Sequence, residues 1–376
     1  MSEPGNGAIP ICVVDPVRLP AWTMPARRIP IGPGYKPCME LLPDGRIVMV
    51  ALFGDKLSGG KMREWAGIWW SQDGGESWTE RQEIKDMIGR EQFLSITKDG
   101  VLFSSSHLLI QDVNNKDNYT SGWLHRSEDG GKTWERHRAT VDGPLRCGIP
   151  EEHGSNSSRN VVELPDGDLL YGVAIRDSAI AYMWRSFDRG KTWDKSQRVA
   201  IRGYYDNADP FFAEDYTFLN ASGRLYHWCR VGHPSPMTSM ADGRVCPSGN
   251  DHCDRMMWTT SDDLGKTWSQ VTDFGDYGQM YPRVLKLKDG RLLMTFTQRG
   301  MSHPLGLRAI VSYDDGESWD FDSDQLIIEG FTPWALSSGG GFGNSIQLAD
   351  GKLVSCYSYA DAGGKPQIEV VRWELP

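Results

Sequence analysis

Five near-identical octapeptides recur along the chain, and no other feature limits its fold as much. Each follows the pattern Ser-x-Asp-x-Gly-x-x-Trp. The Asp can accept hydrogen bonds from backbone amides, the Gly can adopt a positive φ, and the Trp can anchor a turn to an apolar core. The copies lie at residues 71–78, 127–134, 186–193, 261–268 and 312–319. We therefore expect a series of similar β-sheet units, each closed by one such turn.

A second, independent repeat indicates the number of units. Six segments place an Asp-Gly or Ser-Gly turn between two alternating apolar runs, which is a strong signal for a β-hairpin. The turn glycines are Gly45, Gly100, Gly167, Gly223, Gly290 and Gly351. Five of these hairpins are followed by an octapeptide, so each unit consists of an inner hairpin, a variable loop and an outer hairpin.

These repeats predict an all-β, six-bladed β-propeller. They run almost from end to end of the chain, so we expect one domain spanning residues 1–376. The last unit has no octapeptide after it. We expect an N-terminal strand near residues 9–14 to complete that unit and to close the ring.

Composition and charge narrow the class of partner. The chain of 376 residues has a net charge of -10, which argues against nucleic acid, and no apolar run reaches the 18 residues of a membrane span. The seven cysteines are odd in number and lack paired spacing, which is typical of a reducing compartment. Residues 1–10 carry no basic segment followed by an apolar run, so a cytoplasmic location is expected.

The octapeptide is the Asp box, and the chain resembles the sialidase (neuraminidase) superfamily of β-propellers. The resemblance implies that the Asp boxes are fold elements on one face, while the starts of the inner strands line a funnel on the other. Sialidases hold a substrate carboxylate with three arginines, use an Asp as acid and base, and use a Tyr activated by a Glu as nucleophile. By this resemblance Arg230 and Arg308 match the second and third arginines, and Glu214 matches the glutamate.

The chain departs from the sialidase pattern at two positions. Lys36 stands where the first arginine is expected, and Phe342 stands where the tyrosine is expected. Phenylalanine has no oxygen that could attack a sugar. We therefore expect no ordinary retaining sialidase mechanism.

The predicted funnel-facing strand starts are rich in groups that ionise or bond strongly. The cations Lys36, Arg159 and Arg283 indicate a pocket for an anion, and a guanidinium binds a sugar carboxylate in bidentate fashion. Side chains alternate along a strand, so only one of Glu214 and Asp215 can face the funnel, and the resemblance favours Glu214. The expected substrate-binding residues are Lys36, Arg159, Arg230, Arg283, Arg308 and Asn344.

Three functions suit such a funnel. The first is a glycoside hydrolase on a terminal, acidic sugar, in which two carboxyl groups act as acid and base. The second is a polysaccharide lyase, in which a cation neutralises a uronate and a Tyr or His removes a proton. The third is a carbohydrate-binding propeller without catalysis. The candidate catalytic residues are Asp55, Glu91, His153, Glu214 and Tyr281.

One long insertion, residues 231–254, interrupts the fourth unit. Long loops in compact folds commonly serve binding, so we expect a lid or a contact between subunits of a homo-oligomer. Cys246, His252 and Cys253 lack the spacing of a zinc site. We expect neither a metal nor a cofactor.

Overall fold

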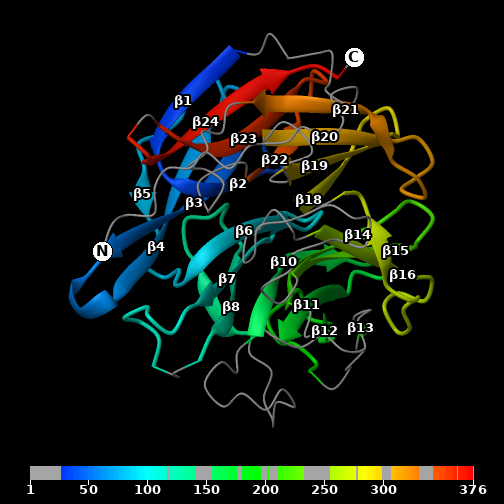
Figure 1. Cartoon of the computed structure of the whole chain (residues 1–376), viewed down its shortest axis with the longest axis horizontal. Helices are drawn as coiled ribbons and strands as arrows, with labels where there is room; N and C mark the ends of the chain where they lie inside the picture. Colours follow the sequence, from blue (N-terminus) through cyan, green and yellow to red (C-terminus); the bar gives the residue numbers. More distant parts are fainter. Residues whose placement is uncertain are drawn as a thin grey trace, which may run out of the picture.

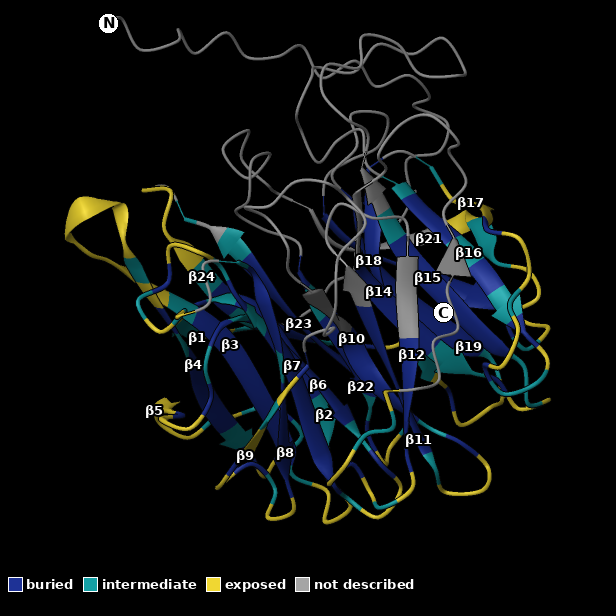
Figure 2. Ribbon diagram, turned by 90° about the horizontal axis from the view of Figure 1, so that it is seen from below, coloured by how far each residue is buried: buried dark blue, intermediate teal, exposed yellow. Residues whose placement is uncertain are grey.

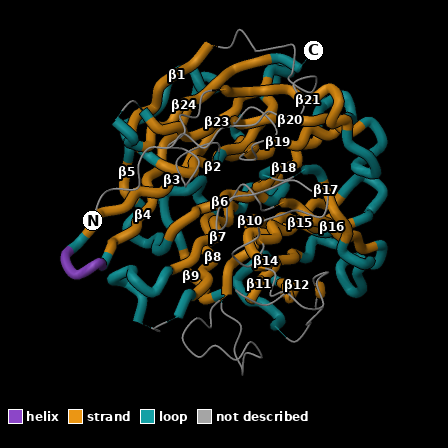
Figure 3. The backbone as a smooth tube through the Cα atoms, viewed as in Figure 1, coloured by secondary structure: helices purple, strands orange, loops and turns teal. Residues whose placement is uncertain are grey.

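The computed structural model describes residues 27–116, 119–139, 155–175, 180–195, 201–202, 211–232, 255–276, 278–298, 306–329, 342–361 and 363–375. Their strands form six four-stranded antiparallel sheets around a central axis (Figure 1). The described secondary structure is almost entirely strand, with one short 3-10 helix, η2 (Ser58–Gly60), in the hairpin tip of the first blade (Figure 3). The prediction of an all-β, six-bladed propeller is confirmed.

Each blade is one sheet, and its four strands are named here from the innermost, nearest the axis, to the outermost. Blade 1 contains β2 (Tyr35–Leu41), β3 (Ile47–Lys56), β4 (Met62–Ser71) and β5 (Gln82–Glu83). Blade 2 contains β6 (Arg90–Ile96), β7 (Leu102–Leu108), β8 (Ser121–Ser127) and β9 (Glu135–Arg138). Blade 3 contains β10 (Ser155–Glu163), β11 (Leu169–Ile175), β12 (Ile180–Ser186) and β13 (Ile201–Arg202).

The other three blades repeat this order. Blade 4 contains β14 (Phe211–Leu219), β15 (Leu225–Gly232), β16 (Arg255–Ser261) and β17 (Thr272–Phe274). Blade 5 contains β18 (Gln279–Lys286), β19 (Leu292–Gln298), β20 (Gly306–Ser312) and β21 (Asp320–Glu329). Blade 6 contains β22 (Gly343–Gln347), β23 (Leu353–Ala360), β24 (Pro366–Trp373) and β1 (Arg27–Pro33).

The N-terminal strand closes the ring, as expected, but its expected position was wrong. The outermost strand of blade 6 is β1, which pairs antiparallel with β24, and residues 9–14 lie outside the described residues. Ile29 and Ile31 alternate along β1 and pack against the apolar core between blades 6 and 1. This short alternating pattern lies close to the first hairpin. It forms the fourth strand of blade 6, the strand that the sequence predicts at residues 9–14.

The six predicted inner hairpins are all present. Their turn glycines have φ between 86° and 93°, a left-handed conformation that favours glycine. In Figure 2 the strands are largely buried, and exposed residues gather in the turns along the lower edge. The repeated turns therefore lie at one end of the propeller.

The Asp box of blade 4 shows why this turn recurs. The Oδ1 atom of Asp263 accepts hydrogen bonds from Ser261 Oγ at 2.8 Å and from Thr267 N at 2.8 Å, and Oδ2 accepts one from Thr267 Oγ1 at 2.6 Å. Gly265 N donates to Ser261 Oγ at 2.9 Å. The bonds from Thr267 lower the pKa of Asp263 to about 2. The other Asp boxes use equivalent bonds at Asp73, Asp129, Asp188 and Asp314.

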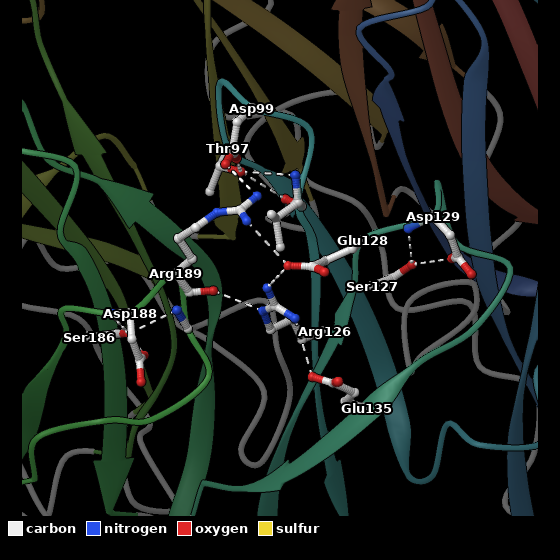
Figure 4. A network of polar contacts seen from close by, with 12 residues as sticks. Thr97, Asp99, Arg126, Ser127, Glu128, Asp129, Glu135, Ser186, Asp188 and Arg189 are labelled. Carbon is white, nitrogen blue, oxygen red and sulfur yellow. Dashed lines mark hydrogen bonds and ion pairs between the residues drawn. The ribbon is translucent and has the colours of Figure 1, made fainter.

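Blades 2 and 3 are also joined by an ionic network beside their Asp boxes (Figure 4). Arg126 is nearly fully buried, pairs with Glu128, and donates from Nε to the carbonyl oxygen of Arg189 at 2.8 Å. Arg189 in turn lies 2.5 Å from Asp99 Oδ2 and 3.4 Å from Glu128 Oε1. This face of the propeller therefore holds neighbouring blades together.

Candidate active site

The inner strands of four blades break register at the same place. Lys36, Glu91, Glu214 and Tyr281 lie within these irregularities with φ of 50°, 61°, 61° and 63°. A left-handed conformation in a residue other than glycine costs about 1–3 kcal/mol, and such strain gathers at functional sites. Blade 3 has a register shift between Ser157 and Val161 in the corresponding strand, and this segment contains Arg159.

The bulges bring side chains from several blades together at the axis. We call this set the funnel cluster and define it as Lys36, Glu91, Arg159, Glu214, Arg230 and Tyr281. Lys36 Nζ pairs with Glu91 Oε1. Arg159 Nη2 lies 3.6 Å from Glu91 Oε2 and 3.0 Å from Glu214 Oε1, so the two carboxyl groups share one guanidinium.

Arg230 joins Tyr281 to the same carboxylate. Its Nη1 atom donates to Glu214 Oε2 and to Tyr281 Oη, each at 2.6 Å. The guanidinium of Arg159 lies over the Tyr281 ring, 3.8 Å from the centroid. Two guanidiniums therefore hold Tyr281, one at its oxygen and one over its ring.

Phe342 forms the apolar side of the cluster. Its side chain is buried. The centroid of its ring lies 4.2 Å from Lys36 Nζ and 4.5 Å from the centroid of the Tyr281 ring. The side chain at the position of the expected tyrosine therefore packs against the cluster. It supplies a cation-π contact to Lys36.

Burial and charge set the protonation of the cluster. Burial lowers the pKa of Lys36 to about 8, although Glu91 and Glu214 oppose this shift. Burial acts to raise the pKa of Glu214, but Arg230, Arg159 and Lys36 hold it well below its usual range. Burial likewise opposes the net lowering of the Glu91 pKa, which Lys36 causes. At neutral pH both carboxylates are ionised and Lys36 is mostly protonated.

Two predicted funnel residues are engaged in joining blades. Arg283 Nη2 donates to Glu40 Oε1 and to the carbonyl oxygen of Leu94, each at 2.8 Å, and Nη1 donates to the carbonyl oxygen of Arg159 at 3.3 Å. The side-chain amide of Asn344 bonds the backbone of Met39 in blade 1. Their direct contact with a substrate stays a prediction.

Three other predicted residues, Asp55, Arg308 and His153, are not members of the funnel cluster as defined above. Asp55 is an exposed carboxylate near the end of β3 that accepts a bond from Trp65 Nε1 at 3.2 Å. Arg308 is fully buried in β20. His153 and nearly all of the insertion at 231–254 lie outside the described residues. Asp215, as expected, points away from the funnel, with Oδ2 3.5 Å from His227 Nε2 in β15.

Sequence reasoning missed Glu64 and Arg90. Glu64 on β4 is buried in phase with Ala66 and Ile68, and its Oε1 lies 3.5 Å from Arg90 Nε. Burial raises the pKa of Glu64 to about 7, although Arg90 opposes this shift. A charged residue in phase with buried apolar positions was the signal that could have found it.

Several buried polar atoms around the cluster have no hydrogen-bond partner among the described residues. They are Glu64 Oε2, Arg90 Nε, Glu91 Oε2, Arg159 Nε and Arg159 Nη2. Buried polar groups are normally bonded, so these atoms have hydrogen-bonding capacity left for a polar ligand. Among the described residues, no cluster of three or more His, Cys, Asp or Glu side chains could hold a metal ion. The helices described there include none that is long and apolar enough to cross a membrane.

Solved structures with this fold include both enzymes and a protein of unknown function. A protein of unknown function from Dyadobacter fermentans has a TM-score of 0.70 at 19% identity, over 94% of this chain and 100% of that chain. The NanB sialidase of Streptococcus pneumoniae has a TM-score of 0.61 at 13% identity, over 91% and 68%. The GH93 α-L-arabinofuranosidase of Fusarium graminearum, solved with arabinobiose, has a TM-score of 0.62 at 15% identity, over 91% and 93%.

At these identities the likeness establishes the fold alone. Comparison with curated proteins gives no match. Residues 26–224, more than half of the chain, match the family model for a BNR repeat-like domain. With five Asp boxes and a six-bladed ring, the chain belongs to this BNR repeat family, and it shares its β-propeller fold with the sialidases.

Proposed function

We propose that the protein is a glycoside hydrolase that acts on a terminal, acidic sugar bound at the funnel cluster. The observation that carries this proposal is the pair Glu91 and Glu214, held together by Arg159 at the axis of the propeller. A pair of carboxyl groups is what glycoside hydrolysis ordinarily uses. The strained bulges that hold both residues support a catalytic purpose.

Charge favours an acidic substrate. Four cations, Lys36, Arg90, Arg159 and Arg230, surround the two ionised carboxylates of Glu91 and Glu214. A buried surplus of positive charge is costly unless an anion offsets it. A sugar carboxylate would supply that charge, and guanidinium groups are well suited to bind it.

The chemistry follows from the different protonation of neighbouring groups. Glu214, held ionised by two guanidiniums, is the carboxylate that acts on the sugar as nucleophile or base. The Lys36–Glu91 pair supplies the proton for the leaving oxygen. Because the pKa of Lys36 is lowered to about 8, its ammonium group is a stronger acid than an ordinary lysine and can donate a proton near neutral pH. The two roles need opposite protonation states, and the cluster provides both.

A lyase remains the second candidate, because of Tyr281. A phenol bonded to Arg230 is suited to removing a proton beside a uronate carboxylate. The two reactions give different products, since a lyase leaves an unsaturated sugar and a hydrolase consumes water.

The test is a panel of glycosides of sialic acid, glucuronate, galacturonate and rhamnose, together with 4-linked oligouronides that carry the leaving group a lyase needs, assayed for reducing sugar and for the ultraviolet absorbance of unsaturated products. A hydrolase gives reducing sugar alone and depends on Glu214 and Glu91. A lyase gives the absorbance and depends most on Tyr281. Binding without turnover across the whole panel contradicts both and leaves a carbohydrate-binding propeller.

A further inference from the structure

Glu64 is a carboxyl group buried beside the funnel cluster. It lies on β4 opposite Gly54, with 3% of its surface exposed, and its Oε2 atom has no hydrogen-bond partner among the described residues. Its position in β4 faces blade 2, where the inner strand β6 begins with Arg90 and Glu91. Glu64 thus lies behind the funnel and not on its surface.

Arg90 lies between two carboxylates without a hydrogen bond to either. Its Nε atom is 3.5 Å from Glu64 Oε1 and 3.7 Å from Glu91 Oε1, and it has no hydrogen-bond partner among the described residues. A small movement of the guanidinium toward either carboxylate would make a charge-assisted bond. Arg90 therefore links Glu64 to the Lys36–Glu91 pair.

The surroundings of Glu64 make its charge sensitive to pH near neutrality. Burial raises its pKa to about 7; Arg90 and Lys36 act against this shift, and Glu91 and Asp112 add to it. Asp112 is fully buried and bonds Glu64 N at 3.0 Å. The nearby His107 has its pKa lowered to about 4 by burial, so it stays neutral in this range.

We propose that Glu64 is a positioning residue that acts through Arg90, and that its ionisation weakens the binding of an anionic sugar at the funnel cluster. The proposal rests on the proposed function. When Glu64 carries its proton, Arg90 is left to Glu91, and the cluster keeps its surplus positive charge. When Glu64 ionises, it adds a negative charge and draws Arg90 away from Glu91.

The direction of the pH effect follows from the charge. Affinity for an acidic sugar is greatest below the pKa of Glu64 and falls as the pH rises through about 7. The charge on Glu64 would act on a sugar carboxylate bound at the neighbouring funnel cluster. In a buried site, one such unit charge changes affinity by roughly fivefold or more. A neutral sugar lacks the charge and shows no comparable fall.

The experiment measures binding of N-acetylneuraminate, glucuronate and galacturonate by calorimetry from about pH 5.5 to about pH 7.5, below the pKa of Lys36 at about 8. Galactose is the neutral probe. The wild-type protein should lose roughly fivefold in affinity for the acidic sugar that it binds. Glu64→Gln should abolish this fall, and Glu83→Gln, which alters an exposed carboxylate of the same blade, should keep it.

A second variant keeps the test decisive if Glu64→Gln does not fold. Arg90→Gln removes the cation that holds the Glu64 pKa down, so the fall should move above the measured range. An unchanged fall in a folded Glu64→Gln or Arg90→Gln protein overturns the proposal and leaves the proposed function intact. Absence of binding by all three acids at every pH contradicts the proposed function itself.

Discussion

The two ends of the propeller use the same strands in opposite ways. At the Asp-box end the blades repeat one arrangement, and the carboxylate of each box accepts bonds from its own turn. At the funnel end the corresponding positions differ from blade to blade, as Lys36, Glu91, Glu214 and Tyr281 show. Repetition therefore marks the parts that build the fold, and departure from it marks the candidate site.

Positive φ occurs at both ends, with different causes. Arg189, Leu264 and Asp315 occupy the fourth position of an Asp box, where other copies have Gly74 and Gly130. The turn itself demands that conformation. None of the four left-handed funnel positions holds glycine. The fold tolerates the backbone strain at these positions although glycine would relieve it. Each position therefore retains a specific side chain, as a pre-organised site requires.

The largest expected effect lies at the Asp-box end. Trp134 is buried in the apolar core, and its Nε1 atom donates to Gly131 O at 3.0 Å. Trp134→Ala should lower the free energy of unfolding by about 3–5 kcal/mol, because it leaves a large cavity. Urea unfolding measures this loss. Trp78→Ala, at a less buried Trp, should cost less, and an equal cost would show that burial does not set the contribution of these residues.

The next effect belongs to the funnel end. Glu214→Gln should reduce turnover about 100-fold or more, while the protein stays folded. Asp215→Asn is the matched control, since Asp215 is adjacent in sequence but faces His227. Steady-state kinetics with a substrate from the glycoside panel measure both variants. If Asp215→Asn loses as much turnover as Glu214→Gln, the assignment of Glu214 fails.

A smaller effect tests the hairpin turns. Gly167 has a φ of 87°, and a Cβ atom there would meet nothing within 4 Å, so Gly167→Ala adds backbone strain alone. We expect the free energy of unfolding to fall by about 1 kcal/mol with turnover unchanged. Gly54→Ala, where φ is not left-handed and the nearest atom would be 3.8 Å from the new Cβ, should cost less. Equal losses would remove the turn conformation as the cause.

The smallest effect concerns acid. The Thr267 bonds lower the folded-state pKa of Asp263 from 3.8 to about 2. Its contribution is therefore complete above pH about 4 and is lost as the pH falls through about 2. Asp263→Asn should lower stability near neutrality, where the contribution of the carboxylate is complete, and should flatten the stability curve between pH about 4 and about 2. Thermal unfolding at a series of pH values measures this. A curve that still falls as steeply would exclude Asp263 as a source of the acid dependence.

The fold was predictable because its signals are local and repeated. Each turn glycine and each Asp box indicates a tight turn between two strands from only a few residues of sequence. The six hairpins can therefore be read directly from the sequence. The ring-closing strand was harder, since Ile29 and Ile31 form only a short alternating pattern and the sequence offers another at residues 9–14. Only pairing with β24 distinguishes them.

The site was predictable only where it follows from strand starts. Glu91, Arg159 and Glu214 lie at those starts, and alternation together with the family resemblance also predicted that Asp215 turns away. Glu64 lies on the third strand of its blade, with no motif around it, and only folding brings it beside Arg90. The bonds of Arg283 to three other blades likewise depend on the closed ring, which no local pattern specifies.

The most direct test of the central claim is a crystal structure of the Glu214→Gln variant soaked with an acidic monosaccharide and, separately, with its neutral analogue. The account predicts that the acid binds at the axis, with its carboxylate against Arg159, Arg230 or Lys36 and its anomeric carbon beside residue 214. The neutral analogue should bind more weakly or not at all. An acidic sugar bound only away from these side chains, or equal occupancy by the neutral sugar, would contradict the claim that the funnel cluster is a site for acidic sugars.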